Sequence, residues 1–266
     1  MPRVTVIIPT YNWSTVLPYS IGSVLAQTFT DFEVLVIGDG CTDDSEAVVR
    51  SIADPRVQWI NIERTGHQSG PNNEGLRRAR GEVIAYLGHD DLWLPHHLAV
   101  HLERDHDFTC SLAALIGPEG STIEPTHPNA AFSRWVPPSS FAHRRSLGIE
   151  WRDYRELSDP PERDLVRRIL QSGARAAVIP RLTVLKFAAS VRRNVYRERP
   201  AHEQSAWLAR VREEPDLEAT LLARMLLHPA PHRMWRFLRE PSQWWAFIWR
   251  RGGNRIRARQ RFKGVS

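Results

Sequence analysis

Residues 4–12 are Val-Thr-Val-Ile-Ile-Pro-Thr-Tyr-Asn, an apolar run that ends in polar residues. Continuous apolar character is typical of a strand that is buried on both faces, as in a parallel sheet. Similar runs occur at residues 32–37, 57–62 and 83–87. Helical patterns separate them, at residues 14–27, 43–52 and 72–80. This alternation predicts an α/β fold with a mixed, mainly parallel sheet flanked by helices.

The pattern becomes less regular after residue 105. We expect a strand at 108–116, a loop at 117–138, a helix at 161–171, and two short strands at 174–179 and 182–187. From about residue 197 the chain is expected to be helical and then basic. A domain boundary is therefore predicted at residue 195, with an α/β domain at 1–195 and a helical basic, aromatic appendage at 196–266.

Composition is that of an ordinary soluble globular protein, with 42% apolar and 25% charged residues. Cys41 and Cys110 are too few for a disulfide framework and lack metal-ligand spacing, which favours a reducing cytosol. No secretory signal is visible, and no apolar run reaches the roughly 20 residues that span a bilayer. We therefore expect a cytoplasmic protein.

The positive charge is concentrated near the C-terminus. The whole chain carries +6, whereas residues 228–266 contain ten Arg or Lys and one Glu, a net +9, which leaves −3 for residues 1–227. The same segment contains Trp235, Trp244, Trp245 and Trp249. Such mixing suits an anionic membrane surface, but a helical cap packed on the domain is an equal alternative. Nucleic-acid binding is not expected.

Ligands of open parallel sheets bind beyond the carboxyl ends of the strands. The residues that follow the first, second and fourth predicted strands are Pro9-Thr10-Tyr11-Asn12, Gly38-Asp39-Gly40 and Gly88-His89-Asp90-Asp91. They include neither the Gly-x-Gly-x-x-Gly turn of dinucleotide-binding proteins nor a P-loop. A carboxylate-rich edge can hold a diphosphate through a bridging Mg²⁺ or Mn²⁺ ion. Asp90 and Asp91 are the predicted ligands of that ion.

Five motifs occur in an order and spacing that resemble a known family. They are VIIPTYN (6–12), SVLAQT (23–28), FEVLVIGDGCTD (32–43), NEGL with ARGE (73–82) and HDDLWLP (89–95). The stretch from 4 to 103 resembles the nucleotide-binding half of family 2 inverting glycosyltransferases of the GT-A fold, and residues 140–187 resemble it weakly. By this resemblance, residues 1–104 bind the nucleotide and 105–195 bind the acceptor.

The resemblance also implies roles for individual residues. Tyr11 would stack on the base, Asp39 would accept a hydrogen bond from it, and Asp90 and Asp91 would contact the ribose and the metal-bound diphosphate. The implied donor site comprises Pro9, Thr10, Tyr11, Asn12, Asp39, Asn72 and Asp90. This chain departs from the family at Gly38 and Gly88, where Asp is frequent, and at Asn72, where a basic residue is frequent.

The catalytic base of the family precedes a helix that resembles residues 164–168, which points to Glu162, with Asp164 as the nearest alternative. Asp159-x-x-Glu162 also has the spacing of a capping box, so a purely structural role for Glu162 remains open. Asp43 and Glu46 have the same spacing. His97 and His101 could form a zinc pair, but a solvated helix face is the preferred interpretation. Asp90 and Asp91 are expected to face solvent.

The predicted activity is inverting transfer of a sugar from a nucleotide-diphosphate donor, preferably a UDP-sugar, to the hydroxyl of a carbohydrate or lipid-linked acceptor. The resemblance suggests a role in cell-envelope polysaccharide or glycolipid synthesis, with attachment to the inner face of the membrane if the basic tail binds lipid. Two alternatives remain. One is a non-catalytic sugar-nucleotide or acceptor-binding relative. The other is a nucleotidyltransferase, although that class would need a Gly- and Arg-rich loop after the first strand.

Overall fold

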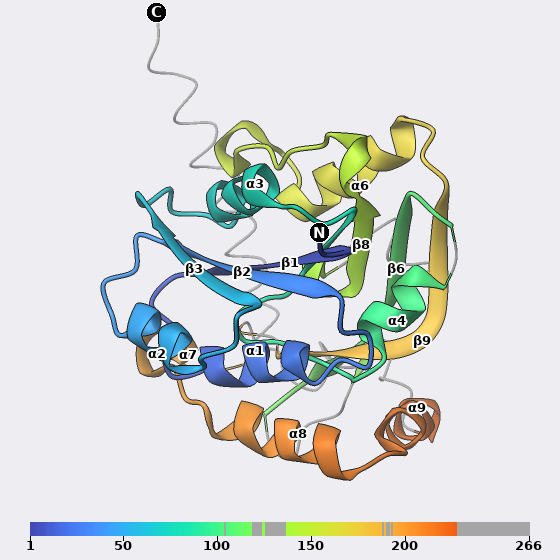
Figure 1. Cartoon of the computed structure of the whole chain (residues 1–266). Coiled ribbons are helices and arrows are strands. Elements are labelled where there is room, and N and C mark those ends of the chain that lie inside the picture. The colour runs from blue at the N-terminus through green and yellow to red at the C-terminus, as the bar shows by residue number, and fades with distance from the viewer. Residues whose placement is uncertain are drawn as a thin grey trace, which may run out of the picture. The chain divides into compact units, whose positions relative to one another are not determined.

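A mixed sheet forms the core of the described part of the chain (Figure 1). The computed structural model describes residues 1–103, 105–118, 124–125, 137–187, 189, 192 and 194–227. The strands in these residues are β1 (Val4–Thr10), β2 (Phe32–Asp39), β3 (Val57–Ile62), β4 (Val83–Tyr86), β5 (Leu92–Trp93), β6 (Phe108–Ile116), β7 (Glu124–Pro125), β8 (Phe141–Arg144) and β9 (Ala176–Phe187). The helices are α1 (Leu17–Leu25), α2 (Ser45–Ser51), α3 (Ser69–Arg78), α4 (His97–Leu102), α6 (Pro161–Gln171), α7 (Val195–Glu198), α8 (His202–Glu213) and α9 (Leu217–Leu227).

The strand order is β3-β2-β1-β4-β8-β6-β9-β5, and β7 pairs with β6. Strands β3, β2, β1 and β4 are parallel, as predicted. Strand β8 is antiparallel to both of its neighbours, and β6 and β9 are parallel to each other. The sheet is therefore mixed, and its parallel half brings the ends of β1, β2, β3 and β4 to one edge.

Side chains alternate between two cores along the buried strands. Val6 and Ile8 of β1 face the core beneath α1, α2 and α4, whereas Ile7 faces the core beneath α3 and α6. Val34 and Leu35 of β2 divide in the same way. Figure 1 shows α3 and α6 on one face of the sheet and α1 on the other. Burial on both faces explains why these strands are continuously apolar.

The domain boundary lies later than residue 195. Met1–Met225 form one compact unit and Leu226–Ser266 a separate one. A third core explains the difference, because Leu208 of α8 and Leu221 of α9 are buried against Leu185 of β9 and its neighbours. Helices α8 and α9 therefore belong to the α/β domain, and the prediction that the appendage starts at 196 is wrong. The predicted helical character is confirmed for the part of this segment that the structure describes, in α8 and α9.

Three local predictions also need correction. Helix α2 begins at Ser45, and Asp43 accepts hydrogen bonds from the backbone N of Ser14 and Ser45, so it ties two loops together and forms no capping box with Glu46. The two short strands expected at 174–187 form the single strand β9. Its pairing with β6 shifts register around Pro180, which lacks a donor for the ladder. Strand β8 falls in a stretch where no strand was predicted.

The basic and aromatic tail from residue 228 lies outside the described residues, so its membrane and packing alternatives remain predictions. No helix in the described part of the chain is long and apolar enough to span a bilayer.

Candidate functional site

A cavity of about 570 Å³ opens at the carboxyl edge of the parallel strands. Its lining comes from the segments that follow β1, β2, β3, β4 and β9, which are otherwise far apart in the chain. The lining residues are Pro9, Thr10, Tyr11, Trp13, Asp39, Arg64, Gly66, His67, Gln68, Pro71, Gly88, His89, Asp90, Lys186, Ala189 and Tyr196. Of the predicted donor-site residues, this cavity includes Pro9, Thr10, Tyr11, Asp39 and Asp90. Its volume is within the range of small-molecule and cofactor sites.

One end of the cavity is formed by Tyr11, Asp39 and Arg64. The guanidinium carbon of Arg64 lies 3.3 Å from the centroid of the Tyr11 ring. Asp39 is buried, and its carboxylate accepts hydrogen bonds from the backbone N of Thr65 at 2.6 Å and of Gly66 at 2.8 Å. Asp39 therefore fixes the loop after β3 that places Arg64 over Tyr11. Base contacts by Tyr11 and Asp39 remain predictions.

The other end has an aromatic wall. The rings of Trp13 and His89 stack with centroids 4.7 Å apart, and Tyr196 meets Trp13 edge-on at 5.9 Å. Nδ1 of His89 donates to the carbonyl oxygen of Pro9 at 3.2 Å, because a carbonyl can only accept. Burial lowers the pKa of His89, so the ring is neutral at neutral pH. Tyr196 belongs to α7, which the predicted domain boundary had excluded.

The two adjacent aspartates occupy different environments. The Asp90 side chain is 13% exposed and lines the cavity, whereas Asp91 is fully buried behind it. Asp91 accepts hydrogen bonds from Ser139 Oγ at 2.5 Å and from Phe187 N at 3.2 Å. The expectation that both aspartates face solvent is therefore wrong for Asp91, because the segments containing β9 and η1 (Pro138–Ser140) close over it.

Lys186 of β9 lies beside the two aspartates at the end of the cavity that contains Asp90. Its Nζ lies 2.9 Å and 3.1 Å from the two carboxylate oxygens of Asp91 and 3.9 Å from Oδ1 of Asp90. Burial alone would lower the pKa of Lys186, but Asp91 and Asp90 outweigh burial and raise it. Lys186 is therefore an ammonium ion placed between the two aspartates.

The predicted base lies beside the cavity wall. Glu162 is in the first turn of α6, and its Oε2 accepts a hydrogen bond from Nε2 of Gln68, a cavity residue, at 3.2 Å. The residue before α6 is Pro160, which forms no side-chain cap, and no bond of a capping box joins Asp159 and Glu162 among the described residues, so the predicted capping box is wrong. Asp159 pairs instead with Arg163 at the surface.

Asp164, the alternative base, has no exposed surface. Its carboxylate is bound by Arg167 at 2.5 Å and by Arg168 at 2.7 Å, and it does not line the cavity. Neither carboxylate lines the cavity, but Glu162 contacts the lining residue Gln68, whereas Asp164 is held by Arg167 and Arg168.

Two further predicted residues, Asn12 and Asn72, do not line the cavity. Asn12 has a φ of +53°, and its Oδ1 accepts from Thr42 N at 2.7 Å, so the side chain braces a turn. Asn72 of α3 is fully buried, and neither its amide N nor its O has a hydrogen-bond partner among the described residues. Direct contact of these two side chains with a donor remains a prediction.

His97 and His101 are buried, so the preferred interpretation of a solvated helix face is wrong. Their Nδ1 atoms lie 2.7 Å from the hydroxyls of Thr183 and Thr109, respectively. The His97 ring also stacks on Trp93 at 4.0 Å. In the described part of the chain no third histidine, cysteine or carboxylate joins the pair to form a metal-binding group. The two histidines are packing elements between α4 and the sheet.

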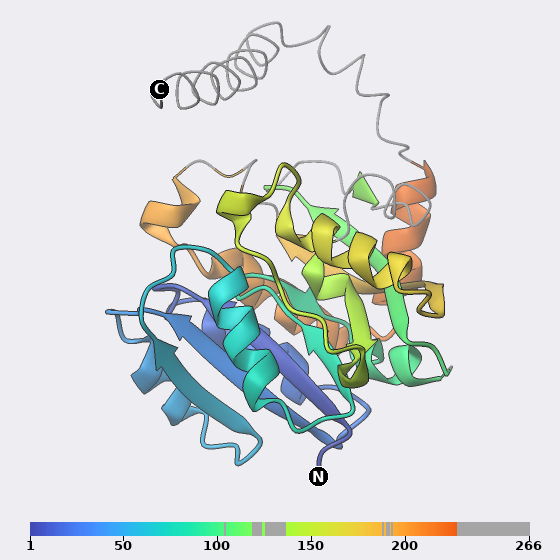
Figure 2. The ribbon, with the colours of Figure 1, turned by 90° about the horizontal axis from the view of Figure 1, so that it is seen from above.

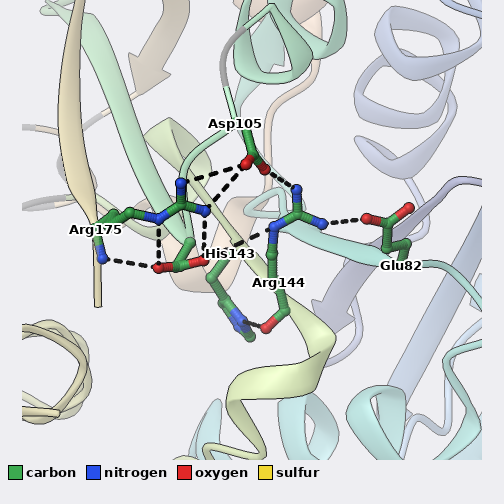
Figure 3. Close-up of polar contacts among 6 residues, drawn as sticks. Glu82, Asp105, His143, Arg144 and Arg175 are labelled. Carbon is green, nitrogen blue, oxygen red and sulfur yellow. Dashed lines mark hydrogen bonds and ion pairs between the residues drawn. The ribbon is translucent and has the colours of Figure 1, made fainter. Parts of the chain in front are cut away.

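A second hollow, of about 260 Å³, lies at the opposite, amino edge of the parallel strands, and its walls include Glu82, Asp105 and Arg144. Figure 3 shows Arg144 between Glu82 and Asp105, with Arg175 also paired to Asp105. Both guanidinium groups are thus neutralised by carboxylates, and this network connects the segments before β4, β6 and β9. Its position and its paired charges favour a structural role.

Several cavity residues were not identified from the sequence. Arg64, His67 and Gln68 follow β3, so applying the strand-end rule to that strand would have found them. Lys186 and Tyr196 carry no local signal, since they reach the cavity only through the pairing of β9 with β6 and β5 and through the placement of α7. Figure 2 shows α7, the short orange helix, near the ends of the blue strands, whereas β9 is a strand of the sheet itself.

Comparison with known proteins identifies the fold and the family. An uncharacterised glycosyltransferase of Nostoc sp. is 39% identical over 98 residues, or 36% of this chain and 30% of that protein. The Escherichia coli UDP-Glc:alpha-D-GlcNAc-diphosphoundecaprenol beta-1,3-glucosyltransferase WfgD is 33% identical over 99 residues, or 37% of this chain and 39% of that protein. These matches thus span about a third of each relative's own length.

A solved structure, S. aureus TarS 1-349 in complex with UDP-GlcNAc, aligns with a TM-score of 0.59 and 21% identity over 92% of this chain and 78% of TarS. This likeness confirms the GT-A fold. The model of the family "Glycosyl transferase family 2" matches residues 5–154, more than half of the chain. The protein therefore belongs to glycosyl transferase family 2.

Proposed function

We propose that this family 2 glycosyltransferase moves a sugar from a nucleoside-diphosphate sugar to an acceptor hydroxyl with inversion at the anomeric carbon. The observation that carries the proposal is the 3.2 Å hydrogen bond between Gln68 and Glu162, which holds a carboxylate beside the cavity at the carboxyl edge. The cavity also has two chemically different ends. Tyr11 and Arg64 lie at one end, and Asp90 and Lys186 lie at the other. A base and a diphosphate need such different surroundings.

In this mechanism Glu162 removes the proton of the acceptor hydroxyl as that oxygen attacks the anomeric carbon. The new carbon–oxygen bond forms while the bond to the diphosphate breaks, and the bonding electrons leave with the phosphate oxygen. Gln68 orients the carboxylate of Glu162. Tyr11 and Arg64 bind the base at the other end of the cavity and thereby position the donor.

We propose a uridine donor and a lipid-linked or polysaccharide acceptor of the cell envelope. The donor is supported by the name of the Escherichia coli relative, which specifies UDP-Glc, and by the UDP-GlcNAc bound to TarS. The acceptor is supported by the diphosphoundecaprenol in the same relative's name. Both ligands belong to those proteins, and they come to this chain only by similarity.

The function is tested by incubating the protein with UDP-Glc, UDP-GlcNAc and GDP-Man and measuring release of the nucleoside diphosphate. We expect release from at least one uridine donor, slow with water alone and faster with an acceptor. Binding of donors without any release would instead support the non-catalytic relative. Release of inorganic diphosphate from a nucleoside triphosphate would support a nucleotidyltransferase.

A divalent ion such as Mg²⁺ or Mn²⁺ would be held by Asp90 and not by Asp91. Asp90 lines the cavity, whereas both oxygens of Asp91 already accept hydrogen bonds. Mg²⁺ in nucleotide sites commonly uses one or two carboxylates together with the phosphates, so a single aspartate fits. When bound, the ion would neutralise charge on the leaving diphosphate.

Asp90→Asn should remove the part of donor binding that depends on Mn²⁺. We expect UDP to raise the melting temperature of the wild-type protein more with Mn²⁺ than with EDTA, because binding to the native state stabilises it. In the variant the two shifts should be equal. Asp54→Asn, at a pair with Arg56 outside the cavity, is the matched control. Equal shifts in the wild-type protein would contradict a metal role.

The C-terminal tail should bind anionic membranes reversibly. Each basic residue near an anionic surface contributes about 1 kcal/mol, so half of the ten in residues 228–266 would suffice for recruitment. We expect the full chain to co-sediment with anionic vesicles at low salt, and a chain ending at Arg239 to stay in solution while still binding UDP. A full chain that remains in solution would contradict this prediction.

A further inference from the structure

Lys186 occupies the space between the two aspartates of the acidic motif. Its ammonium contacts both oxygens of Asp91, at 2.9 Å and 3.1 Å, and lies 3.9 Å from Asp90. The Lys186 side chain is 19% exposed and lines the cavity, whereas Asp91 is buried and does not. The cavity therefore meets the positive end of this ion pair, with the negative end behind it.

A divalent ion that bridges Asp90 and Asp91 does not fit this arrangement. Such an ion would lie about 2 Å from each carboxylate, which would bring it against the ammonium of Lys186. There is also no space for a further acid at Gly88, since a Cβ there would be 2.8 Å from Oδ2 of Asp91. The position expected for a bridging metal is held by a fixed side-chain cation.

The distribution of charged residues in the cavity supports the same conclusion. Among the described lining residues the acids are Asp39 and Asp90, and the permanent cations are Arg64 and Lys186. Asp39 is engaged by the backbone of the loop after β3, and Arg64 lies at the Tyr11 end. Lys186 is thus the cation at the Asp90 end, where the diphosphate of a donor with its base at Tyr11 would lie.

We propose that Lys186 binds the diphosphate of the donor directly and takes the place of a metal ion bridging Asp90 and Asp91. This inference rests on the proposed function and extends it. It implies that nucleoside diphosphate binding persists without divalent metal, and that an ion at Asp90 adds to binding without being required for it. Asp91 acts through Lys186 by holding its ammonium at the cavity surface.

The competing explanation is that Lys186 only neutralises Asp91. A variant that removes Lys186 alone would leave a buried carboxylate unpaired and could fail to fold. We therefore compare Asp91→Asn with the double variant Lys186→Met/Asp91→Asn. Neither leaves a buried carboxylate unpaired at position 91, and they differ only in the presence of the lysine. Lys186→Arg in the wild-type background preserves the charge and provides a third arm.

The test is titration of uridine and UDP into each protein in EDTA by calorimetry. We expect wild-type protein and Lys186→Arg to bind UDP more tightly than uridine by roughly tenfold or more, the worth of a charge-assisted contact. Asp91→Asn should keep a reduced but clear preference, because Lys186 and one oxygen acceptor at position 91 remain. In the double variant this preference should fall to near unity, while uridine affinity stays unchanged. Arg181→Met, which removes a cation paired with Glu218 outside the cavity, should behave like wild type.

Equal preferences for UDP in Asp91→Asn and in the double variant would overturn the assignment of Lys186, as would a wild-type protein that gains its preference for UDP only when Mn²⁺ is added. Failure of the proposed function gives a different result, because wild-type protein would then bind neither uridine, UDP nor GDP under either condition.

Discussion

Glu162→Gln should lower turnover by roughly 10²-fold or more and leave donor affinity close to that of the wild-type protein. The amide keeps the shape of the side chain and still offers an oxygen to the Nε2 donor of Gln68, so the wall of the cavity should persist. It cannot accept the proton of the acceptor hydroxyl. The loss should therefore appear in turnover and not in binding.

The measurement pairs initial rates of nucleoside diphosphate release with calorimetric donor affinities. Glu156→Gln is the matched control, because Glu156 is exposed on η3 (Tyr154–Glu156) and does not line the cavity. Asp164→Asn breaks contacts to Arg167 and Arg168, so it should lower stability and leave the rate per folded molecule near normal. Normal turnover in Glu162→Gln would return Glu162 to a structural role.

The parallel half of the sheet and much of the cavity could be predicted because both depend on local patterns. A strand that is buried on both faces must be apolar throughout, as Val6, Ile7 and Ile8 show. The polar residues after such a strand must lie at its carboxyl end. Tyr11, Asp39 and Asp90 were found in this way, from the order of apolar runs alone.

The features of the site that could not be predicted depend on partners that lie far away in the chain. Lys186 reaches Asp91 across a sequence separation of 95 residues. Which of two adjacent aspartates is buried is decided by β9 and Ser139 closing over one of them. No periodicity within the motif encodes that choice, so the sequence suggested two equivalent ligands where the structure has one cavity residue and one buried ion-pair partner.

The predicted capping boxes at the starts of two helices were wrong for a related reason. Asp43 and Glu162 stand at capping-box spacing, but each carboxylate has a better partner elsewhere, in Ser14 N and in Gln68, respectively. Because tertiary partners engage both carboxylates, the capping-box spacing alone does not decide the geometry. The histidines of α4 show the same limit, since a polar residue on a short helix appears solvated until the strand covering it is known.

The protein should lose stability steeply between pH 6.5 and pH 5, because several buried histidines must be neutral in the folded state. Burial lowers the pKa of His101 to about 3 and that of His143 to about 4. Nδ1 of His143 donates to the carbonyl of Arg144, and its Nε2 accepts from the hydroxyl of Tyr86, so the network requires the neutral ring. The unfolded chain, in contrast, protonates its histidines near pH 6.5.

The direction of the stability change with pH follows from the number of protons that each state binds. Below about pH 6.5 the unfolded state binds more protons than the folded state, so the free energy of unfolding falls as the pH falls. Each of these two histidines should cost about 2 kcal/mol at pH 5. Together they remove about 4 kcal/mol, a large share of the total stability of a domain, which is about 5–15 kcal/mol. His97, whose pKa burial also lowers, acts in the same direction.

Denaturant unfolding near neutral pH and near pH 5 measures this loss, and His101→Gln assigns a share of it. The substitution also lowers the free energy of unfolding through lost packing. This loss is the same at both pH values, so it cancels when the two values are compared within one variant. The difference should therefore shrink by about 2 kcal/mol relative to wild type. His202→Gln, at an exposed position of α8, should leave the difference unchanged. If His101→Gln keeps the full wild-type loss, the buried imidazole of His101 is not held neutral, and the acid sensitivity must come from other groups.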